Sequence, residues 1–188
     1  YNCYDNFSGN DLDGDGRPEF MVASHDANPE GAVVRLHIYE AIGNNLYNIV
    51  YIDSVTNLPT TAWYGMNSYC GDVDGDGREE IALAVNNGWL IYKAVGDNEY
   101  VRIFTAYPGG SQWRSTGIHI CDLNNNGYRE IIVSHYDSRN DTFETGIWEI
   151  EGVRLHQPNG GEVLQPGSQF PITWEKFTPP GADSFTLF

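Results

Sequence analysis

The sequence has few basic residues and no long apolar run, and each shortage narrows the possible functions. The 188 residues include 10 Lys and Arg against 26 Asp and Glu, which gives a formal net charge of −16. Nucleic acids and anionic membrane surfaces are bound through Lys and Arg, so both are excluded as main partners. A membrane-spanning helix needs about 18 or more consecutive apolar residues. The sequence has no such run, so it predicts no membrane insertion.

Motifs of catalysis are also missing. The sequence contains no G-x-S-x-G or H-E-x-x-H motif and no phosphate-binding loop. The five histidines are scattered, and no C-x-x-C or Cys/His pair suggests a zinc site. These absences favour a protein that is not an enzyme.

Cysteine is scarce, and the three that occur leave two interpretations open. Cys3, Cys70 and Cys121 can be small buried apolar residues, since free cysteine is among the most buried residue types. The alternative is one disulfide, such as Cys3 with Cys70, and a third thiol left over. Glycosylation sequons begin at Asn6 and Asn140, and they matter only in a host that glycosylates asparagine.

What the sequence does contain is one acidic loop written three times. The copies occupy residues 11–19, 72–80 and 122–130 and read DLDGDGRPE, DVDGDGREE and DLNNNGYRE. Each copy has an oxygen-bearing side chain at positions 1, 3, 5 and 9 and a glycine at position 6. Hard cations such as Ca²⁺ take about six to eight oxygen ligands, and glycine allows the sharp turn such a loop needs. The repeat therefore predicts about three cation sites.

The loops differ from EF-hands, and the difference predicts the fold. An EF-hand needs an acid at position 12 and flanking helices, whereas position 12 is Val22, Leu83 or Val133. Short apolar runs follow position 9 at once, at residues 20–23, 81–85 and 131–133. They have no helical period, so they are predicted to be buried strands. Each loop therefore joins two strands.

Further strands are expected at 33–40, 46–53, 89–94, 99–106 and 145–151, between Gly- and Asn-rich turns. A repeat of roughly 50 residues made of several short strands is typical of a propeller blade. Residues 1–151 are thus predicted to be all-β, with about three propeller-like blades in an open or partial array. The first loop begins so early that we expect the blade strand before it to be incomplete.

The loop pattern followed by an apolar strand resembles the FG-GAP or VCBS repeat, found in integrin-α-like propellers and in secreted bacterial proteins. The resemblance implies that side chains at positions 1, 3, 5 and 9 and the carbonyl at position 7 bind Ca²⁺. Carried over, the implied ligands are Asp11, Asp13, Asp15, Arg17 and Glu19; Asp72, Asp74, Asp76, Arg78 and Glu80; and Asp122, Asn124, Asn126, Tyr128 and Glu130. Two asparagines replace aspartates in the third set, so we expect lower affinity there.

A second resemblance covers residues 152–188. The segments QPNGGE at 157–162 and ITW at 172–174 are similar to the opening strands of an immunoglobulin-like or fibronectin-type-III-like module. A complete β-sandwich needs about 100 residues, so a partial sandwich or a strand-exchange tail is expected. Residues 184–188 are the candidate for a strand added to a neighbour.

We interpret the chain as a secreted or cell-surface module for adhesion, binding or assembly, stabilised by Ca²⁺. Two alternatives stay open: an accessory domain of a secreted hydrolase or lyase, and a subunit of an extracellular filament built by strand pairing. The expected partner is a protein or glycan at the cell surface, or further copies of the chain. Aromatic side chains concentrate at binding surfaces; the candidate partner-binding residues are Trp63, Tyr64, Trp113 and Arg114.

Overall fold

The chain folds into β-strands alone in the part that the structure describes. The computed structural model describes residues 2–28, 31–58, 67–85, 88–106, 113–125, 127–137, 139–149, 152–157 and 173–177. These residues form thirteen strands, and no helix occurs among them. A search of the same residues accordingly finds no helix that could cross a membrane. The all-β prediction is confirmed.

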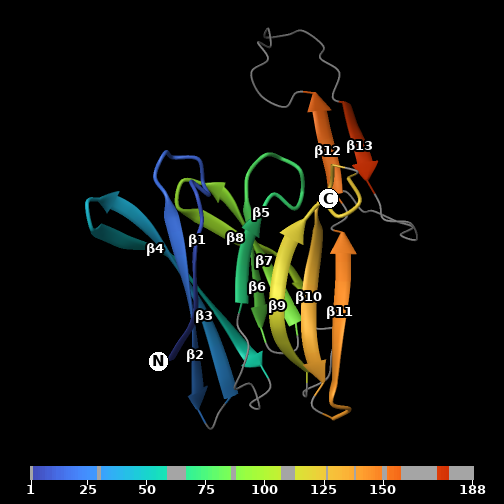
Figure 1. Cartoon of the computed structure of the whole chain (residues 1–188). Coiled ribbons are helices and arrows are strands. Elements are labelled where there is room, and N and C mark those ends of the chain that lie inside the picture. Colours follow the sequence, from blue (N-terminus) through green and yellow to red (C-terminus); the bar gives the residue numbers. More distant parts are fainter. Residues whose placement is uncertain are drawn as a thin grey trace, which may run out of the picture.

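Three antiparallel sheets follow one another along the chain, each with its strands in sequence order (Figure 1). The first contains β1 Asn2–Ser8, β2 Glu19–Asn28, β3 Gly31–Gly43 and β4 Leu46–Leu58. The second contains β5 Asn67–Gly71, β6 Glu80–Val85, β7 Gly88–Gly96 and β8 Glu99–Ala106. The third contains β9 Trp113–Cys121, β10 Glu130–Asp137 and β11 Thr142–Glu149. We call these sheets blades one, two and three.

The strand predictions hold closely. The apolar runs after the loops lie in β2, β6 and β10, and four of the later predicted segments lie in β3, β4, β7 and β8. The segment predicted at 145–151 is described as far as residue 149, in β11. A strand, β1, precedes the first loop and pairs with β2 as far as Asn2 opposite His25, whereas β2 continues to Asn28.

Blade two lies between the other blades, and its strand β6 is buried on both faces. One face joins a core shared with blade one, and the opposite face joins a core shared with blade three. From blade two, the first core receives Ile81, Leu83, Val85 and Leu90, and the second receives Ala82, Ala84, Trp89 and Ile91. Face-to-face packing explains why residues 81–85 of β6 are continuously apolar instead of alternating.

The blades form an open array among the described residues, which is compatible with a partial propeller. The remaining strands, β12 Gly152–Gln157 and β13 Thr173–Phe177, pair with each other in a sheet of their own. They lie within the predicted 152–188 segment. Residues 184–188, predicted to be an added strand, lie outside the described residues.

Candidate metal centre

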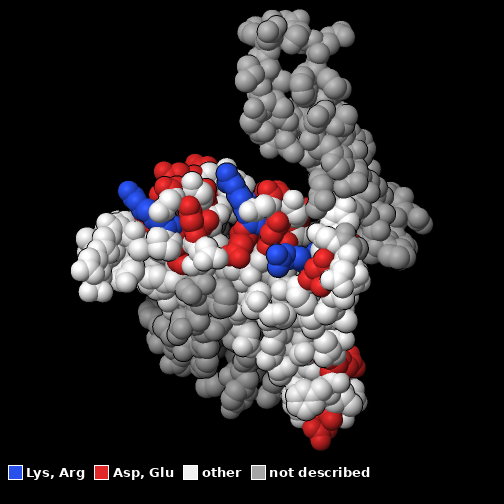
Figure 2. Space-filling view, turned by 45° about the horizontal axis from the view of Figure 1, so that its top comes forward, with Lys and Arg blue, Asp and Glu red and all other residues white. Residues whose placement is uncertain are grey.

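The three acidic loops join equivalent strands and lie at one end of the molecule. They connect β1 to β2, β5 to β6, and β9 to β10 (Figure 1). Figure 2 shows acidic side chains gathered over this end, with basic side chains among them. Loops one and two lie close together, since Asn10, the residue before loop one, donates from Nδ2 to Glu79 Oε2 at 3.1 Å. The repeat in the sequence thus becomes a row of carboxylate-rich turns.

The three loops share a backbone conformation. Positions 4 and 6 have positive φ in every copy: 83° and 93° at Gly14 and Gly16, 76° and 90° at Gly75 and Gly77, and 58° and 88° at Asn125 and Gly127. Glycine and asparagine are the residues that adopt this left-handed region most readily. The position-6 amide donates to the position-1 aspartate in each copy, at 2.9, 3.0 and 3.0 Å.

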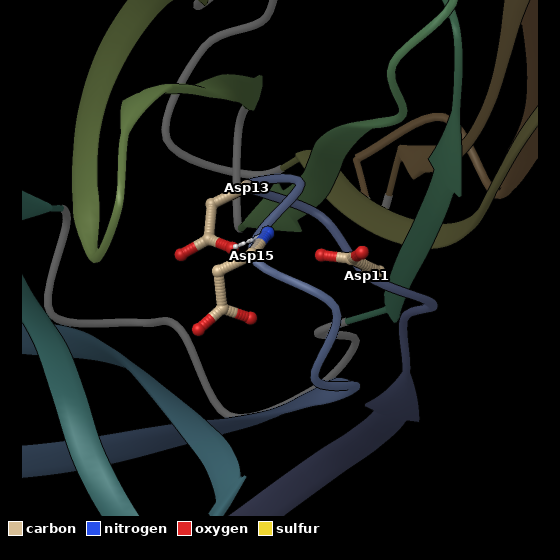
Figure 3. A group of neighbouring side chains, drawn as sticks. All are labelled: Asp11, Asp13 and Asp15. Atoms are coloured by element: carbon tan, nitrogen blue, oxygen red, sulfur yellow. Dashed lines mark hydrogen bonds between the residues drawn. The ribbon is translucent and has the colours of Figure 1, made fainter.

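In loop one, three carboxylates come together. Asp11, Asp13 and Asp15 each offer an oxygen, and these oxygens lie within 4.8 Å of one another (Figure 3). Backbone amides fix each carboxylate: Gly14 N donates to Asp11 at 2.8 Å, Asp15 N to Asp13 at 3.2 Å, and Arg17 N to Asp15 at 2.8 Å. Fixed carboxylate oxygens that lie close together are the type of ligand that a hard cation prefers.

The position-9 glutamates are buried beneath their loops. Oxygen Oε2 accepts the amide of position 2 in all three copies: Leu12 N to Glu19 at 2.6 Å, Val73 N to Glu80 at 2.9 Å, and Leu123 N to Glu130 at 2.8 Å. Burial raises the pKa of Glu19 and of Glu80 to about 7, and repulsion from nearby aspartate charge contributes to the rise. A bound cation would offset the cost of burying these carboxylates in the charged form, because it favours the ionised carboxylate.

The other glutamate oxygen, Oε1, differs between the loops. In loop two, Glu80 Oε1 accepts a hydrogen bond from Lys93 Nζ at 3.1 Å. In loop three, Glu130 Oε1 accepts one from Asn124 Nδ2 at 2.6 Å. In loop one, Glu19 Oε1 is buried and has no hydrogen-bond partner among the described residues. A buried carboxylate oxygen without a donor is costly, so the residues of loop one fit a cation.

Sequence reasoning missed two acids next to loop one. Glu40 on β3 pairs across the sheet with Glu19, and its carboxylate groups with those of Asp13 and Glu19 within 4.8 Å. Asp97, in the turn between β7 and β8, joins Asp15 and Glu40 in a further group. These acids reach the loop from the third strand of the blade and from the neighbouring blade. Only the strand register, which the loop motif does not contain, could have revealed them.

Sequence reasoning also missed a positively charged side chain, Lys93, at loop two. Lys93 Nζ on β7 forms ion pairs with three carboxylates: Asp74, Asp76 at 2.8 Å and Glu80 at 3.1 Å. Burial alone would lower the pKa of Lys93, but hydrogen bonds to Asp74 and Asp76 outweigh it and raise the pKa. Three of the predicted ligands, Asp72, Asp74 and Glu80, offer oxygens that lie within 4.8 Å of one another. The ammonium therefore contacts three carboxylates that are also predicted metal ligands.

Loop three brings together fewer charges. Its carboxylates are Asp122 and Glu130, and no group of three His, Cys, Asp or Glu ligands forms there among the described residues. Asn124 contacts Glu130, whereas Asn126 lies outside the described residues. Arg17, Arg78 and Tyr128 stand at position 7 of the three loops, and the proposed carbonyl ligation at these residues stays a prediction.

The remaining predicted residues are placed only in part. Trp63 and Tyr64 lie outside the described residues, and Trp113 and Arg114 are described only as backbone positions of β9, opposite Asp137 and Tyr136. Cys70 and Cys121 are free thiols, so the Cys3–Cys70 disulfide is wrong. Burial raises the pKa of the Cys70 thiol, which accords with the apolar interpretation of this residue.

The chain matches the FG-GAP-like repeat family at residues 11–83 and 72–133. These overlapping matches cover more than half of the chain, and each begins on the first residue of an acidic loop. The protein therefore belongs to the FG-GAP-like repeat family. No curated protein and no solved structure matches the chain.

Proposed function

We propose that the protein is an extracellular binding or adhesion module whose acidic loops hold Ca²⁺ as a structural ion. The observation that carries this proposal is Glu19, a buried carboxylate with an unpartnered oxygen inside a group of acids. Family membership supports it, since FG-GAP-like repeats are typically extracellular structural modules without catalytic activity. The proposed ligands are the sequence-predicted sets at the three loops, with up to about three ions.

A metal-binding melt tests the calcium part of the proposal. An ion that binds the folded chain alone stabilises it by mass action, by roughly 2.7 kcal/mol when its concentration is 100 times the dissociation constant. We expect millimolar Ca²⁺ to raise the melting temperature above that in excess EGTA. Mg²⁺, which demands a smaller octahedral site, should do less. Equal melting temperatures in Ca²⁺ and EGTA would refute calcium binding.

The proposed location is outside the cell, secreted or at the cell surface. Sites of modest affinity fill where calcium is millimolar, and the net charge of −16 disfavours nucleic acid as a partner. A protein or glycan at the cell surface is the proposed partner, with Trp63, Tyr64, Trp113 and Arg114 as candidate contacts. Binding to a glycan array, compared with binding to surface-protein extracts, distinguishes a lectin from a protein adhesin.

A second candidate function is assembly with further copies of the chain. Blades one and two have four strands, whereas blade three has three among the described residues. Strand β11 is therefore an edge, and Phe143 and Ile147 on it are 74% and 58% exposed. Open edges accept added strands. Deleting residues 182–188 should abolish any filament seen by electron microscopy; a truncated chain that still assembles would refute this strand-addition route.

The segment after residue 151 is proposed to be a separate β module, the start of an immunoglobulin-like domain. The two-stranded sheet of β12 and β13 supports a boundary near residue 151. Such a module is common to adhesins and to accessory domains of secreted hydrolases or lyases. The domains that adjoin it in the complete gene would discriminate between these two.

A further inference from the structure

One position in each blade faces the buried glutamate of the loop from the third strand. In blade one, Glu40 on β3 pairs with Glu19. In blade two, Ile81 pairs with Tyr92, which sets the next residue, Lys93, across from Glu80. In blade three, Glu149 on β11 pairs with Glu130. The same structural position thus carries an acid in blades one and three and a base in blade two. The charge reversal between blades one and two is independent of the loop motif, which is nearly identical in those two blades.

In blade one the acid at this position enlarges the cation site. Asp13, Glu19 and Glu40 are all buried and offer oxygens within 4.8 Å of one another. Arg17 Nη1 donates to one oxygen of Glu40 at 2.8 Å, and Asn98 Nδ2 to the other at 3.3 Å. Arg17 is largely exposed at the rim, so one solvated guanidinium is set against three buried carboxylates.

Two further oxygens of blade two are buried beside this group without a hydrogen-bond partner among the described residues: Asn98 Oδ1 and the Tyr100 hydroxyl. The backbone amide of Asn98 donates to Asp13 Oδ2 at 2.7 Å, which fixes the turn against loop one. Together with Glu19 Oε1, several buried oxygens at one place lack donors. A divalent cation with bound water would satisfy them.

In blade two the base at this position already supplies the positive charge. The Lys93 ammonium is within ion-pair distance of Asp74, Asp76 and Glu80. Glu80 Oε1, the counterpart of the unpartnered Glu19 oxygen, is one of its acceptors. Lys93 is four-fifths buried, so its charge is poorly screened by solvent. An incoming ion would have to displace it from the same oxygens.

We propose that, in blades one and two, the third-strand residue facing the buried glutamate decides whether the loop takes a divalent cation. Glu40 completes a calcium site in loop one, and the Lys93 ammonium takes the place of the ion in loop two. This inference rests on the proposed calcium-binding function and narrows it, since the native chain then holds an ion in loop one but not in loop two. The loop motif alone does not show this difference.

The first test removes the ammonium. Lys93→Gln should bind one more Ca²⁺ per chain than the native protein, counted by equilibrium dialysis and elemental analysis. Without the ammonium, the buried Glu80 carboxylate loses its compensating charge, so the melting temperature in EGTA should fall and Ca²⁺ should restore it. The matched control, Lys93→Arg, keeps the charge and should leave the ion count unchanged. An unchanged count in Lys93→Gln overturns the proposal.

A second test, on Glu40, decides the inference if Lys93→Gln does not fold. Glu40→Lys should bind one Ca²⁺ fewer than the native chain, and Glu40→Gln should weaken that site by roughly tenfold or more. A Glu40→Lys chain that keeps every native ion overturns the proposal. If the native chain binds no Ca²⁺ while Lys93→Gln binds one, the proposed function fails and the role of Lys93 stands. If no variant binds Ca²⁺, both fail.

Discussion

Glu19, Glu80 and Glu130 hold the same place in three loops, yet their second oxygens meet different neighbours. Glu80 faces an ammonium, Glu130 faces a side-chain amide, and Glu19 Oε1 has no donor among the described residues. The difference concentrates uncompensated negative charge in blade one. A cation is expected to matter most where the chain supplies the fewest donors of its own.

Glu19 should make the calcium-free protein sensitive to pH. Burial and the nearby aspartates raise its pKa to about 7, from an ordinary value of about 4.5. A carboxyl whose pKa is higher in the folded state stabilises the fold when protonated, and that stability is lost as pH rises through about 7. In EGTA, the free energy of unfolding should therefore decrease between about pH 4.5 and pH 7, measured by urea denaturation.

The matched variant Glu19→Gln isolates this effect, since the neutral amide cannot ionise. The difference in unfolding free energy between the two proteins should change with pH in EGTA, with Glu19→Gln gaining relative stability as pH rises. Ca²⁺ should reverse the trend for the native chain, because the ion favours the ionised carboxylate. A difference that is constant between pH 4.5 and pH 7 would show that Glu19 does not titrate in this range.

The loop residues could be predicted from the sequence because their geometry is local. Oxygen side chains at alternate positions and a turn at position 6 follow from a single short segment. Glu40 and Lys93 could not be predicted in this way, because the register of β2 with β3 and of β6 with β7 places them beside the loops. The sequence distance from Glu19 to Glu40 differs from that between Glu80 and Lys93, so no fixed spacing identifies them.

At the scale of the strand, the sequence predicted the position of β6 but not that two blades would enclose it. A continuously apolar run indicates burial on both faces, and the clusters with blades one and three confirm it. What the run does not encode is how closely the neighbouring strands approach. Strands β5 and β9 come so near at Gly71 that a Cβ built there would lie 2.8 Å from Ile120 Cγ2.

Gly71→Ala should therefore destabilise the interface between blades two and three. Overpacking of this kind costs roughly 1–3 kcal/mol, measured as the change in free energy of unfolding in urea. Gly117→Ala is the matched control, because no heavy atom lies within 4 Å of a Cβ built at that strand position. In an Ile120→Ala background, the cost of Gly71→Ala should largely vanish. Equal losses for Gly71→Ala and Gly117→Ala would show that backbone effects, and not the close approach, dominate.

At the scale of the whole molecule, blades one and two are joined by more than their shared apolar core. The Tyr92 hydroxyl donates to Asp53 across the interface at 2.8 Å, and the backbone amide of Asn98 donates to Asp13 at 2.7 Å. The second bond ends on a proposed calcium ligand. An ion at loop one would thus hold the Asp13 carboxylate in place for the neighbouring blade, so that binding and blade docking share one side chain.

This linkage predicts that calcium protects two segments that are far apart in the sequence. Hydrogen–deuterium exchange should slow at residues 11–19 and also at the β7–β8 turn around Asn98, because local opening of that turn breaks its bond to Asp13. The hairpin at 139–141 in blade three has no such connection in the described structure and serves as the internal control. Protection confined to residues 11–19 would show that the ion stabilises its own loop without coupling the blades. Protection that extends to the β7–β8 turn but not to 139–141 would make loop one a calcium-dependent clamp between blades one and two.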